Sequence, residues 1–468
     1  ISNGMKTILV PAFERQQVKV ILLSGIIEEL LRCSKIRIVV IVPSYQVDEY
    51  EKEFKNKGIV FEGIEPISRY VSRMDALFGR LSFLYVDSAA NRTFRKYINF
   101  TKQKGYSKYI LLSVLQFLLG KLKILRIVIR SLDRILVYDH RFDALFERYK
   151  PDMVLLSRID LTLDQSLLRH AKKRNITSIG MLGTWGTIMS PRHSFRFLPD
   201  KFIVWGEISK NEAIKYLGVP KRNIFVSGAP TFDRYITGTT VEKEQFYRKF
   251  DVDSSKRIIL FASVAAQNPT EYQVLKKLHN AVEGHILPHD IVFLVRNHPI
   301  DDMVRGTLVR GDLKSSPHIV FDNAQTFFEQ GSTYLEGLES ASVHLANSLF
   351  HSVLLITTAS IFAREAALFD KPIINLCFDG DEYKLPHESI VRYYEKSSPR
   401  YVSGIHGGVQ FAHSFNELIT YINRYLNDPE RDKNQRHEML VRQAYKLDGR
   451  SVERIVDFLQ HTLKNIAT

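Results

Sequence analysis

Residues 354–376 (LLITTASIFAREAALFDKPIINL) most constrain the fold, because their hydrophobic period changes twice within one short stretch. Residues 353–356 form an apolar run that predicts a buried strand. Alanines at helical spacing follow, and the sequence Asp-Lys-Pro at 370–372 predicts the end of that helix. A second apolar run at 373–376 predicts another strand. This order of elements is typical of a β-α-β unit with parallel strands.

The same alternation of strand and helix runs through most of the chain. Strands are predicted at 6–12, 36–43, 59–67, 151–157, 177–182, 201–205, 224–227, 257–261, 291–296, 318–321 and 352–356. Helices are predicted at 15–32, 50–57, 165–174, 209–217, 271–282, 333–341, 415–426, 435–445 and 451–464. The pattern predicts the α/β class with two doubly wound, Rossmann-like parallel sheets.

The length of 468 residues exceeds what one hydrophobic core supports, so we expect two domains. Residues 236–256 are polar without a sustained period and are interpreted as the linker between domains 1–235 and 257–450. The terminal helix at 451–464 is expected to pack back on the first domain. Because ligands bind outside the carboxyl ends of parallel strands, both domains are expected to face one cleft.

The positive charge is concentrated in one segment, 68–136, which we expect to be a basic helical insertion in the first domain. It holds fourteen Lys or Arg against three Asp, in a chain of formal charge +14. Large apolar residues lie between the basic ones, a pattern that suggests a surface on an anionic membrane. The alternative is an insertion with an apolar core face and a solvated basic face. Nucleic-acid binding is a third interpretation, but no recognised motif supports it.

Composition places the chain among globular proteins, with 45% hydrophobic and 25% charged residues. Cys33 and Cys377 are far apart in sequence and fit a reducing compartment, without the spacing of metal ligands. The apolar run at 109–120 is too short to span a bilayer. The turn after the first strand lacks the GxGxxG fingerprint, so a dinucleotide cofactor is not indicated.

The helix inside 354–376 begins where hydroxyl side chains gather. Thr357, Thr358 and Ser360 stand at its start, where free backbone amides favour an anion. Glu365, one turn further in, is at suitable reach for the two hydroxyls of a ribose. The alternative is an ordinary crossover helix in which these hydroxyls only cap the end.

Four short motifs in order resemble known families. Residues 201–233, ending near Gly-Ala-Pro, resemble the segment that closes the first domain of many GT-B glycosyltransferases. Arg-Asn-His-Pro at 296–299 resembles the Arg-x-His-Pro of CDP-glycerol glycerophosphotransferases and of surface-polysaccharide transferases. Residues 357–375 resemble their donor-binding unit and that of UDP-N-acetylglucosamine 2-epimerases. Gly-Gly-Val at 407–409, with 448–454, resembles the tail of surface-polysaccharide transferases.

This resemblance covers about Asp200 to Leu463, and the first two hundred residues match only in pattern. It implies a GT-B fold with a donor-binding second domain and an acceptor-side first domain. The implied donor-binding residues are Arg296, His298, Thr357, Thr358, Ser360 and Glu365. The hydroxyls would hold a diphosphate, Glu365 the ribose, and Arg296 a phosphate through a bidentate contact.

The reaction also needs a base for the acceptor hydroxyl, and the first domain should supply it from a strand end. Asp160 is the first candidate, Glu14 the second and His140 the third, each with a capping or salt-bridge role as its alternative. Trp185 is a candidate for stacking on a sugar, with core packing as the alternative. No Asp-x-Asp pair stands in a convincing metal-binding loop, so we expect metal-independent chemistry without a cofactor.

These observations predict a glycosyltransferase that moves a sugar from a nucleotide-sugar donor to a cell-surface glycan or lipid-linked acceptor. A CDP-glycerol-type polyol-phosphate transferase is the first alternative, followed by a UDP-sugar 2-epimerase and a non-catalytic nucleotide-binding scaffold. The expected location is cytoplasmic, peripheral at the inner face of the cytoplasmic membrane. Expected partners are the donor, the acceptor and an anionic membrane surface, but no nucleic acid.

Overall fold

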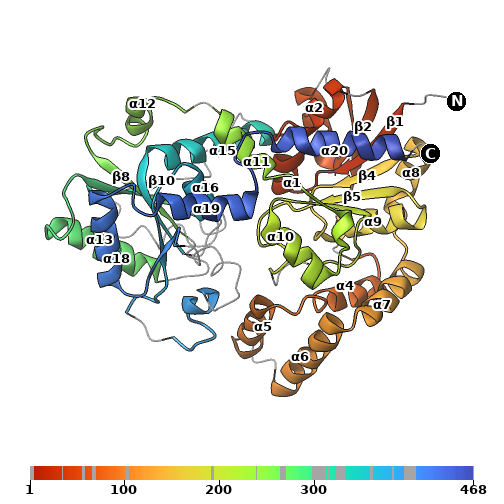
Figure 1. Cartoon of the computed structure of the whole chain (residues 1–468), viewed down its shortest axis with the longest axis horizontal. Helices are drawn as coiled ribbons and strands as arrows, with labels where there is room; N and C mark the ends of the chain where they lie inside the picture. The colour runs from red at the N-terminus through yellow and green to blue at the C-terminus, as the bar shows by residue number, and fades with distance from the viewer. Residues whose placement is uncertain are drawn as a thin grey trace. The chain divides into compact units, whose positions relative to one another are not determined.

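The computed structural model describes residues 5–33, 35–54, 58–65, 70–101, 105–190, 194–238, 240–263, 270–297, 313, 316–322, 333–358, 362–381, 384–394 and 407–466. The chain divides into two compact units. Unit 1 comprises Ile1–Thr237 and Arg442–Thr468, and unit 2 comprises Gly238–Val441. Each unit contains its own parallel sheet flanked by helices (Figure 1), so the prediction of two α/β domains is confirmed.

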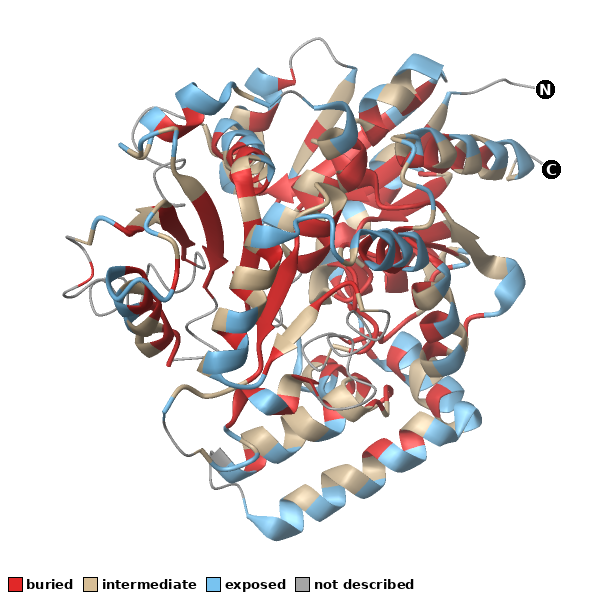
Figure 2. Ribbon diagram, turned by 60° about the vertical axis from the view of Figure 1, so that its left-hand side comes forward, coloured by how far each residue is buried: buried red, intermediate tan, exposed pale blue. Residues whose placement is uncertain are grey.

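The sheet of unit 1 has the strand order β3-β2-β1-β4-β5-β6-β7, and all of its neighbouring strands are parallel. Its strands are β1 (Lys6–Pro11), β2 (Ile36–Pro43), β3 (Ile59–Ile64), β4 (Met153–Leu156), β5 (Thr177–Met181), β6 (Lys201–Val204) and β7 (Ile224–Val226). The helices around it are α1 (Arg15–Ile21), α2 (Ile26–Cys33), α3 (Val47–Glu53), α8 (Asp143–Tyr149), α9 (Thr162–Lys173), α10 (Glu207–Glu212), α11 (Pro230–Thr237) and α20 (Ser451–Asn465). The central strands are almost wholly buried, as the red colouring in Figure 2 shows.

Strands β1 and β4 lie side by side at the point where the winding of this sheet reverses. From β1 the chain proceeds outward to β2 and β3, and from β4 it proceeds in the other direction to β7. Ile8 pairs with Met153 and Leu9 with Val154. The loops that follow β1 and β4 therefore leave the sheet at adjacent positions, which is where open α/β sheets bind ligands.

The single helix predicted over 15–32 is wrong, because the chain breaks it into α1 and α2. Gly25 adopts φ +93°, a conformation that L side chains rarely adopt. The hydroxyl of Ser24 donates to the carbonyl oxygen of Val20 at 2.6 Å and so helps to end the first helix. The apolar stripe continues across the break, which is why periodicity alone did not reveal it.

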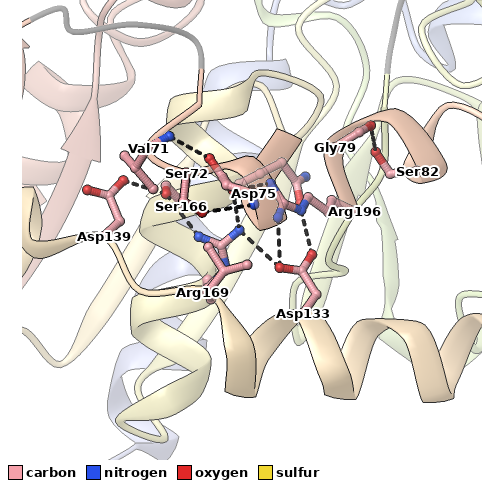
Figure 3. A network of polar contacts seen from close by, with 12 residues as sticks. Val71, Ser72, Asp75, Gly79, Ser82, Asp133, Asp139, Ser166, Arg169 and Arg196 are labelled. Carbon is pink, nitrogen blue, oxygen red and sulfur yellow. Dashed lines mark hydrogen bonds and ion pairs between the residues drawn. The ribbon is translucent and has the colours of Figure 1, made fainter. Parts of the chain in front are cut away.

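Four helices stand between β3 and β4 and carry the basic segment: α4 (Arg73–Ser82), α5 (Ala89–Thr101), α6 (Tyr106–Lys121) and α7 (Lys123–Leu136). A buried network of charges joins α4 and α7 to α9 and to the loop after β5 (Figure 3). Arg196, in the loop after β5, donates to Asp133 of α7 and to Asp75 of α4. Arg169 of α9 donates to the same two carboxylates, at 3.1 Å to Asp75 and 3.2 Å to Asp133. Two cations and two anions thus satisfy one another where water is excluded.

The end of the chain completes unit 1. Helix α20 contacts α2 and α11. The rings of Phe225 and Phe458 stack with centroids 4.4 Å apart, and the Asp233 carboxylate accepts the N–H of Val452 at 2.8 Å. A Cβ on Gly228 (φ +94°) would lie 2.5 Å from the Ser451 hydroxyl, so glycine is needed for this close approach.

The sheet of unit 2 has the order β10-β9-β8-β11-β12-β13, again with parallel pairs throughout. Its strands are β8 (Arg257–Ala262), β9 (Ile291–Arg296), β10 (Ile319–Asp322), β11 (Ser352–Thr357), β12 (Ile373–Leu376) and β13 (Gln410–Ala412). Its helices are α12 (Lys243–Arg248), α13 (Glu271–Glu283), α15 (Tyr334–His351), α16 (Phe362–Leu368), α18 (Phe415–Asn427) and α19 (Lys433–Ala444), the last of which leads back into unit 1. The reversal of winding falls between β8 and β11, and β11-α16-β12 is the unit predicted from 354–376.

The segment interpreted as a linker, 236–256, contains a helix. Helix α12 belongs to unit 2, with Phe246 and Tyr247 buried. The N–H of Val241 donates to the side chain of Asn347 in α15 at 2.8 Å. Six helical residues are too few to reveal a period, which explains why the segment looked irregular.

Candidate active site

Two of the three predicted bases meet at the point of reversal in unit 1. Glu14 follows β1, Asp160 follows β4, and Arg158 lies between them. Arg158 donates through Nη1 to Glu14 Oε2 at 3.1 Å and through Nη2 to Asp160 Oδ2 at 2.5 Å. The side chain of Glu14 is 52% exposed, whereas that of Asp160 is 1% exposed. Glu14 is therefore the more accessible carboxylate, whereas the ranking of the two as candidate bases stays a prediction.

A second buried pair fixes the loop that carries Glu14. The side-chain oxygen of Gln17 accepts the backbone N–H groups of Phe13 and Glu14, at 2.8 and 3.0 Å. The amide nitrogen of Gln17 donates to Asp164 of α9, at 2.9 and 3.0 Å from its two oxygens. Asp164 thus sets the orientation of Gln17, and Gln17 sets the backbone from which Glu14 projects.

Burial and charge shape the ionisation of this cluster. Burial raises the pKa of Asp164 well above its ordinary value, and the negative charge of Asp160 adds to the effect. Burial alone would lower the pKa of Arg158, but the charge and hydrogen bond of Asp160 raise it above its ordinary value. Arg158 therefore stays cationic between the two carboxylates, and Asp164 favours its neutral form.

His140, the third candidate base, lies apart from this cluster, and Trp185, the candidate for stacking on a sugar, is a buried side chain. His140 is 85% exposed and contacts Asp143 at 3.2 Å, beside the last turn of α9. Asp164 lies in the first turn of the same helix, and His170 lies in its last turn. At 1.5 Å per residue, the two are about 9 Å apart along the helix axis. Trp185 is buried, 6% exposed, in the turn after β5. Neither role is tested by these positions.

In unit 2, Arg296 ends β9 and is held by a chain of polar groups, in which Asp322 and His344 are buried and Lys249 is at the surface. Its Nη1 donates to Asp322 Oδ2 at 2.7 Å, at the end of β10. The other oxygen of Asp322 lies 2.9 Å from Nε2 of His344 in α15, and Nδ1 of His344 lies 3.1 Å from the ammonium of Lys249. Because an ammonium only donates, Nδ1 accepts and Nε2 carries the proton that binds Asp322.

The ionisation of this chain follows from its burial. Burial lowers the pKa of His344, and the neighbouring Asp322 only partly offsets that effect. Burial alone would raise the pKa of Asp322, but the hydrogen bond from His344 and the charge of Arg296 hold it below its ordinary value. Burial also lowers the pKa of Lys249. Asp322 is therefore an anion that fixes the guanidinium of Arg296.

Thr357 and Thr358 stand at the end of β11, but both hydroxyls are engaged inside the protein. Thr357 donates to the carbonyl oxygen of Ala262 at 2.9 Å, and Thr358 donates to Glu271 Oε1 at 2.7 Å. Ser263, after β8, donates to the other oxygen of Glu271 at 2.7 Å. These contacts tie β8 and β11 together at the reversal point, so both threonines have a structural use in addition to the predicted one.

The remaining predicted residues are placed only in part. Helix α16 begins at Phe362, and Glu365 lies in its first turn, half-buried. Ser360 and His298 lie outside the described residues, so their predicted contacts to a donor stay predictions.

Among the residues that the structure describes, no cluster of His, Cys, Asp or Glu is arranged to hold a metal ion. The two members of the Asp-Gly-Asp sequence have separate partners: Asp379 accepts the N–H of Ile390 at 2.8 Å, and Asp381 pairs with Lys277 at 2.5 Å. In that same described part, no helix has the length and apolar character needed to cross a bilayer.

Sequence reasoning missed Arg158, Gln17, Asp164, Asp322 and His344. A signal existed for three of them: Gln17 and Asp164 each stand early in a helix that follows a strand of the reversal pair, and Asp322 ends a strand. Asp322 and Arg296 end adjacent strands with opposite charges, which is also visible in the sequence. No local pattern marks His344, since it is one of several polar residues on a long helix.

A family model matches residues 198–461, and its family is described as CDP-glycerol:poly(glycerophosphate) glycerophosphotransferase. The match covers more than half of the chain. The chain belongs to this family. The resemblance expected from Asp200 to Leu463 is therefore confirmed.

A curated relative is the teichoic acid poly(ribitol-phosphate) polymerase of Bacillus spizizenii, 23% identical over 273 residues. The matched region covers 55% of this chain but only 36% of the relative. UDP-GlcNAc 2-epimerase from Neisseria meningitidis, solved with UDP-GlcNAc, is a structural neighbour with TM-score 0.55 and 13% identity, covering 98% of this chain and 100% of that one. A glycosyltransferase from Rickettsia africae has TM-score 0.51 and 12% identity, covering 99% of both chains. At these identities the solved structures show a shared fold.

Two of the motifs that carry the family resemblance pack the protein together. Arg454 of the tail donates to the carbonyl oxygen of Ser227 at 2.7 Å, directly before Gly228-Ala229-Pro230. A Cβ on Gly408 would lie 2.9 Å from the carbonyl oxygen of Gln435 in α19, so this glycine permits close packing. The motifs around Arg296 and Thr357 are the ones that lie at strand ends, where ligands bind.

Proposed function

We propose that this protein is a transferase that moves a group from a nucleotide-diphosphate-linked donor to a hydroxyl of a cell-surface glycan or lipid-linked acceptor. The observation that carries the proposal is the fixed Arg296 at the carboxyl edge of the unit 2 sheet. A buried guanidinium held by Asp322 is suited to the phosphates of a donor, because its planar donors are already oriented. Family membership supports the same class of chemistry.

Each unit would contribute one part of the reaction. In unit 2, Arg296 would bind the phosphates and stabilise the charge that develops on the leaving group, and Glu365 would accept hydrogen bonds from the ribose. In unit 1, Glu14 would take the proton from the acceptor hydroxyl, with Asp160 and Arg158 setting its electrostatic environment. The acceptor oxygen then attacks, and the nucleotide leaves with the bonding electron pair. No metal or cofactor is required by this scheme.

Two donors fit the proposal. A nucleotide sugar would give glycosyl transfer, with attack at the anomeric carbon and release of a nucleoside diphosphate. A CDP-linked polyol would give polyol-phosphate transfer, with attack at phosphorus and release of CMP. The description of the family and the name of the Bacillus spizizenii relative favour the second donor, whereas the solved neighbour bound to UDP-GlcNAc favours the first.

We also propose that the protein works as a peripheral protein at the inner face of the cytoplasmic membrane. A lipid-linked acceptor would be presented there, and activated donors are made in the cytoplasm. The basic, apolar helices α5 to α7 support this location.

The test is a thermal-shift screen with UDP, GDP, CDP, CMP and their sugar or polyol conjugates. A donor at about a thousand times its dissociation constant should stabilise the protein by about 4 kcal/mol. Glu365→Ala should lose most of the shift, whereas Glu244→Ala on the exposed side of α12 should keep it. No shift with any nucleotide would refute the donor site.

The nature of the released nucleotide then separates the two donors. Release of UDP or GDP in the presence of a bacterial lipid extract identifies glycosyl transfer, and release of CMP identifies polyol-phosphate transfer. Glu14→Gln should abolish release while the thermal shift with the donor persists. If Glu14→Gln turns over at the wild-type rate, the assignment of the base is wrong.

A further inference from the structure

Helix α7 (Lys123–Leu136) buries charged side chains and exposes aliphatic ones. Its inward side carries Arg126, Arg130 and Asp133, which are buried or half-buried. Its outward side is aliphatic, with Ile124 77% and Ile135 70% exposed. An amphipathic helix of a water-exposed domain normally shows the opposite arrangement.

Specific contacts hold this orientation. Asp133 pairs with Arg169 and Arg196, as Figure 3 shows. Arg130 donates to the carbonyl oxygens of Arg196 and Phe195, at 2.9 and 3.1 Å, and Arg126 donates to the carbonyl oxygen of Tyr216 at 2.8 Å. Rolling the helix to bury its aliphatic side would remove Asp133 and leave the buried Arg169 and Arg196 with Asp75 as their remaining carboxylate in the network, so the apolar side stays outside.

Helix α6 lies against α7 and extends the same kind of surface. We name as the α6–α7 face the exposed apolar side chains of the two helices and their junction: Tyr106, Ile110, Leu111, Val114, Phe117, Leu118, Leu122, Ile124, Ile127, Val128, Leu132, Ile135 and Leu136. Isolated exposed leucines are ordinary on protein surfaces, but this many exposed apolar side chains on two helices in contact mark an interaction site.

The exposed charges that α6, α7 and their junction carry are all of one sign, and the neighbouring Asp87, which packs against Gly120, is paired with Arg92. Every residue from 105 to 136 is described, and the sole acidic residue in that range, Asp133, is buried in the network. The exposed Lys and Arg side chains in that range are Lys108, Lys121, Lys123 and Arg134. An apolar surface with a basic border complements an anionic lipid surface, where the apolar side chains enter the acyl region and the cations meet headgroups.

We infer that the α6–α7 face docks the protein in the plane of an anionic phospholipid bilayer. The purpose of this docking, access to a lipid-linked acceptor, rests on the proposed function. The docking itself needs no substrate. At 1.5 Å per residue, α7 is about 21 Å long, which suits a helix lying in the interface. A second copy of the chain is a poorer occupant, because it would bring the same basic border against its like.

The test is co-sedimentation of the full chain with sucrose-loaded vesicles. Vesicles of phosphatidylcholine with 30% phosphatidylglycerol should bind the protein. The affinity for vesicles of phosphatidylcholine alone should be lower by roughly tenfold or more. The double variant Ile124→Asp with Ile135→Asp should lose binding roughly tenfold or more, because two carboxylates would have to enter the interface. These side chains are exposed, so circular dichroism and thermal unfolding should match the wild type.

The control places the same charges on exposed aliphatic residues of unit 2. Ile286→Asp with Val343→Asp, at side chains 60% and 44% exposed, should bind vesicles as the wild type does. Lys121→Glu with Lys123→Glu should weaken binding to the anionic vesicles and reduce its dependence on salt.

Three outcomes would overturn the inference. The first is absence of wild-type binding to either kind of vesicle, and the second is equal binding by the α7 variant and the unit 2 control. The third is a wild-type dimer in solution that Ile124→Asp with Ile135→Asp converts to a monomer, since a second copy would then cover the face. Vesicle binding with no nucleotide-induced thermal shift would leave the docking in place and remove the proposed transferase.

Discussion

Asp133 of α7 and Arg196 of the loop after β5 form a two-point ion pair in the core of unit 1. Nε of Arg196 lies 2.5 Å from Oδ2, and Nη2 lies 2.7 Å from Oδ1. The side chains are 0% and 3% exposed. The pair joins the helical insertion to the sheet and, with Arg169 and Asp75, decides which side of α7 faces solvent.

Replacing Asp133 by alanine should therefore destabilise the protein strongly. Arg169 and Arg196 would stay buried with one carboxylate between them, and breaking a buried pair in this way costs about 3–5 kcal/mol. Urea unfolding of Asp133→Ala at pH 7.5 measures the loss. The matched control is Arg92→Ala, which removes the exposed pair with Asp87 and should cost under about 1 kcal/mol. Similar losses in both variants would contradict the assigned role of the network.

His170 should make the protein sensitive to mild acid. Burial, with the nearby charge of Arg174, lowers its pKa to about 4. In the unfolded chain the His170 ring has its ordinary pKa near 6.5, so below that pH the unfolded state binds a proton that the folded state does not bind. The free energy of unfolding therefore decreases as pH falls from about 6.5 to about 4. The full loss is roughly 3 kcal/mol, most of it by pH 5.

Urea unfolding at pH 7.5 and pH 5 checks this prediction. His170→Gln lacks the titrating ring, so its free energy of unfolding should fall less than that of the wild type between the two values. His140→Gln, at a ring that is 85% exposed, should fall as the wild type does. Parallel losses in the wild type and His170→Gln would show that the buried ring does not carry the effect.

Asp164 should show the opposite dependence on pH. Its folded pKa is raised by burial, so its contribution is complete below the unfolded pKa and is lost as pH rises towards the folded pKa. Asp164→Asn keeps an oxygen for Gln17 and does not ionise, so its stability relative to the wild type should improve from pH 4 to pH 7. Asp164→Leu removes the acceptor and should cost about 1–3 kcal/mol through the unpaired amide of Gln17. A constant difference between wild type and Asp164→Asn across this range would disprove the raised pKa.

Arg296→Lys should weaken donor binding without unfolding unit 2. Lysine keeps the charge but loses the planar donors that match a phosphate, and we expect roughly a tenfold loss of affinity. Isothermal titration with the donor found in the thermal-shift screen measures it. Arg257→Lys is the control, because Arg257 pairs with Asp290 at 2.6 Å at the opposite, amino end of the same sheet. Equal affinities of the two variants would remove Arg296 from the donor site.

The parallel order of both sheets was predictable because each strand is a short apolar run between helical periods. Residues 354–376 correctly predict the β11-α16-β12 unit, and the other strands were predicted as well, except the short β13, which was not; helix α11 was also missed. The break at Gly25 was not predictable, because the apolar stripe continues across it. The helix α12 was not predictable, because its six residues are too few to show a helical period.

The candidate site was predictable only where it depends on strand ends. Glu14 and Asp160 are predicted from sequence because each follows a strand, and the sheet order places those strands side by side. The contacts that Arg158 and Gln17 make with them depend on the directions of the side chains, and the spacing of residues along the chain does not predict those directions. The inward direction of Arg130 on α7 was unpredictable for the same reason, because a helical pattern separates two faces without saying which one is buried.

The packing of α20 against α2 and α11 has a consequence during synthesis on the ribosome. The hydrogen bond between Asp233 and Val452 can form only after Val452 is synthesised, 219 residues later, and the six strands described in unit 2 are translated in between. The second unit can therefore complete its sheet while the first still lacks its last helix, so the half that is translated first is the half that matures last.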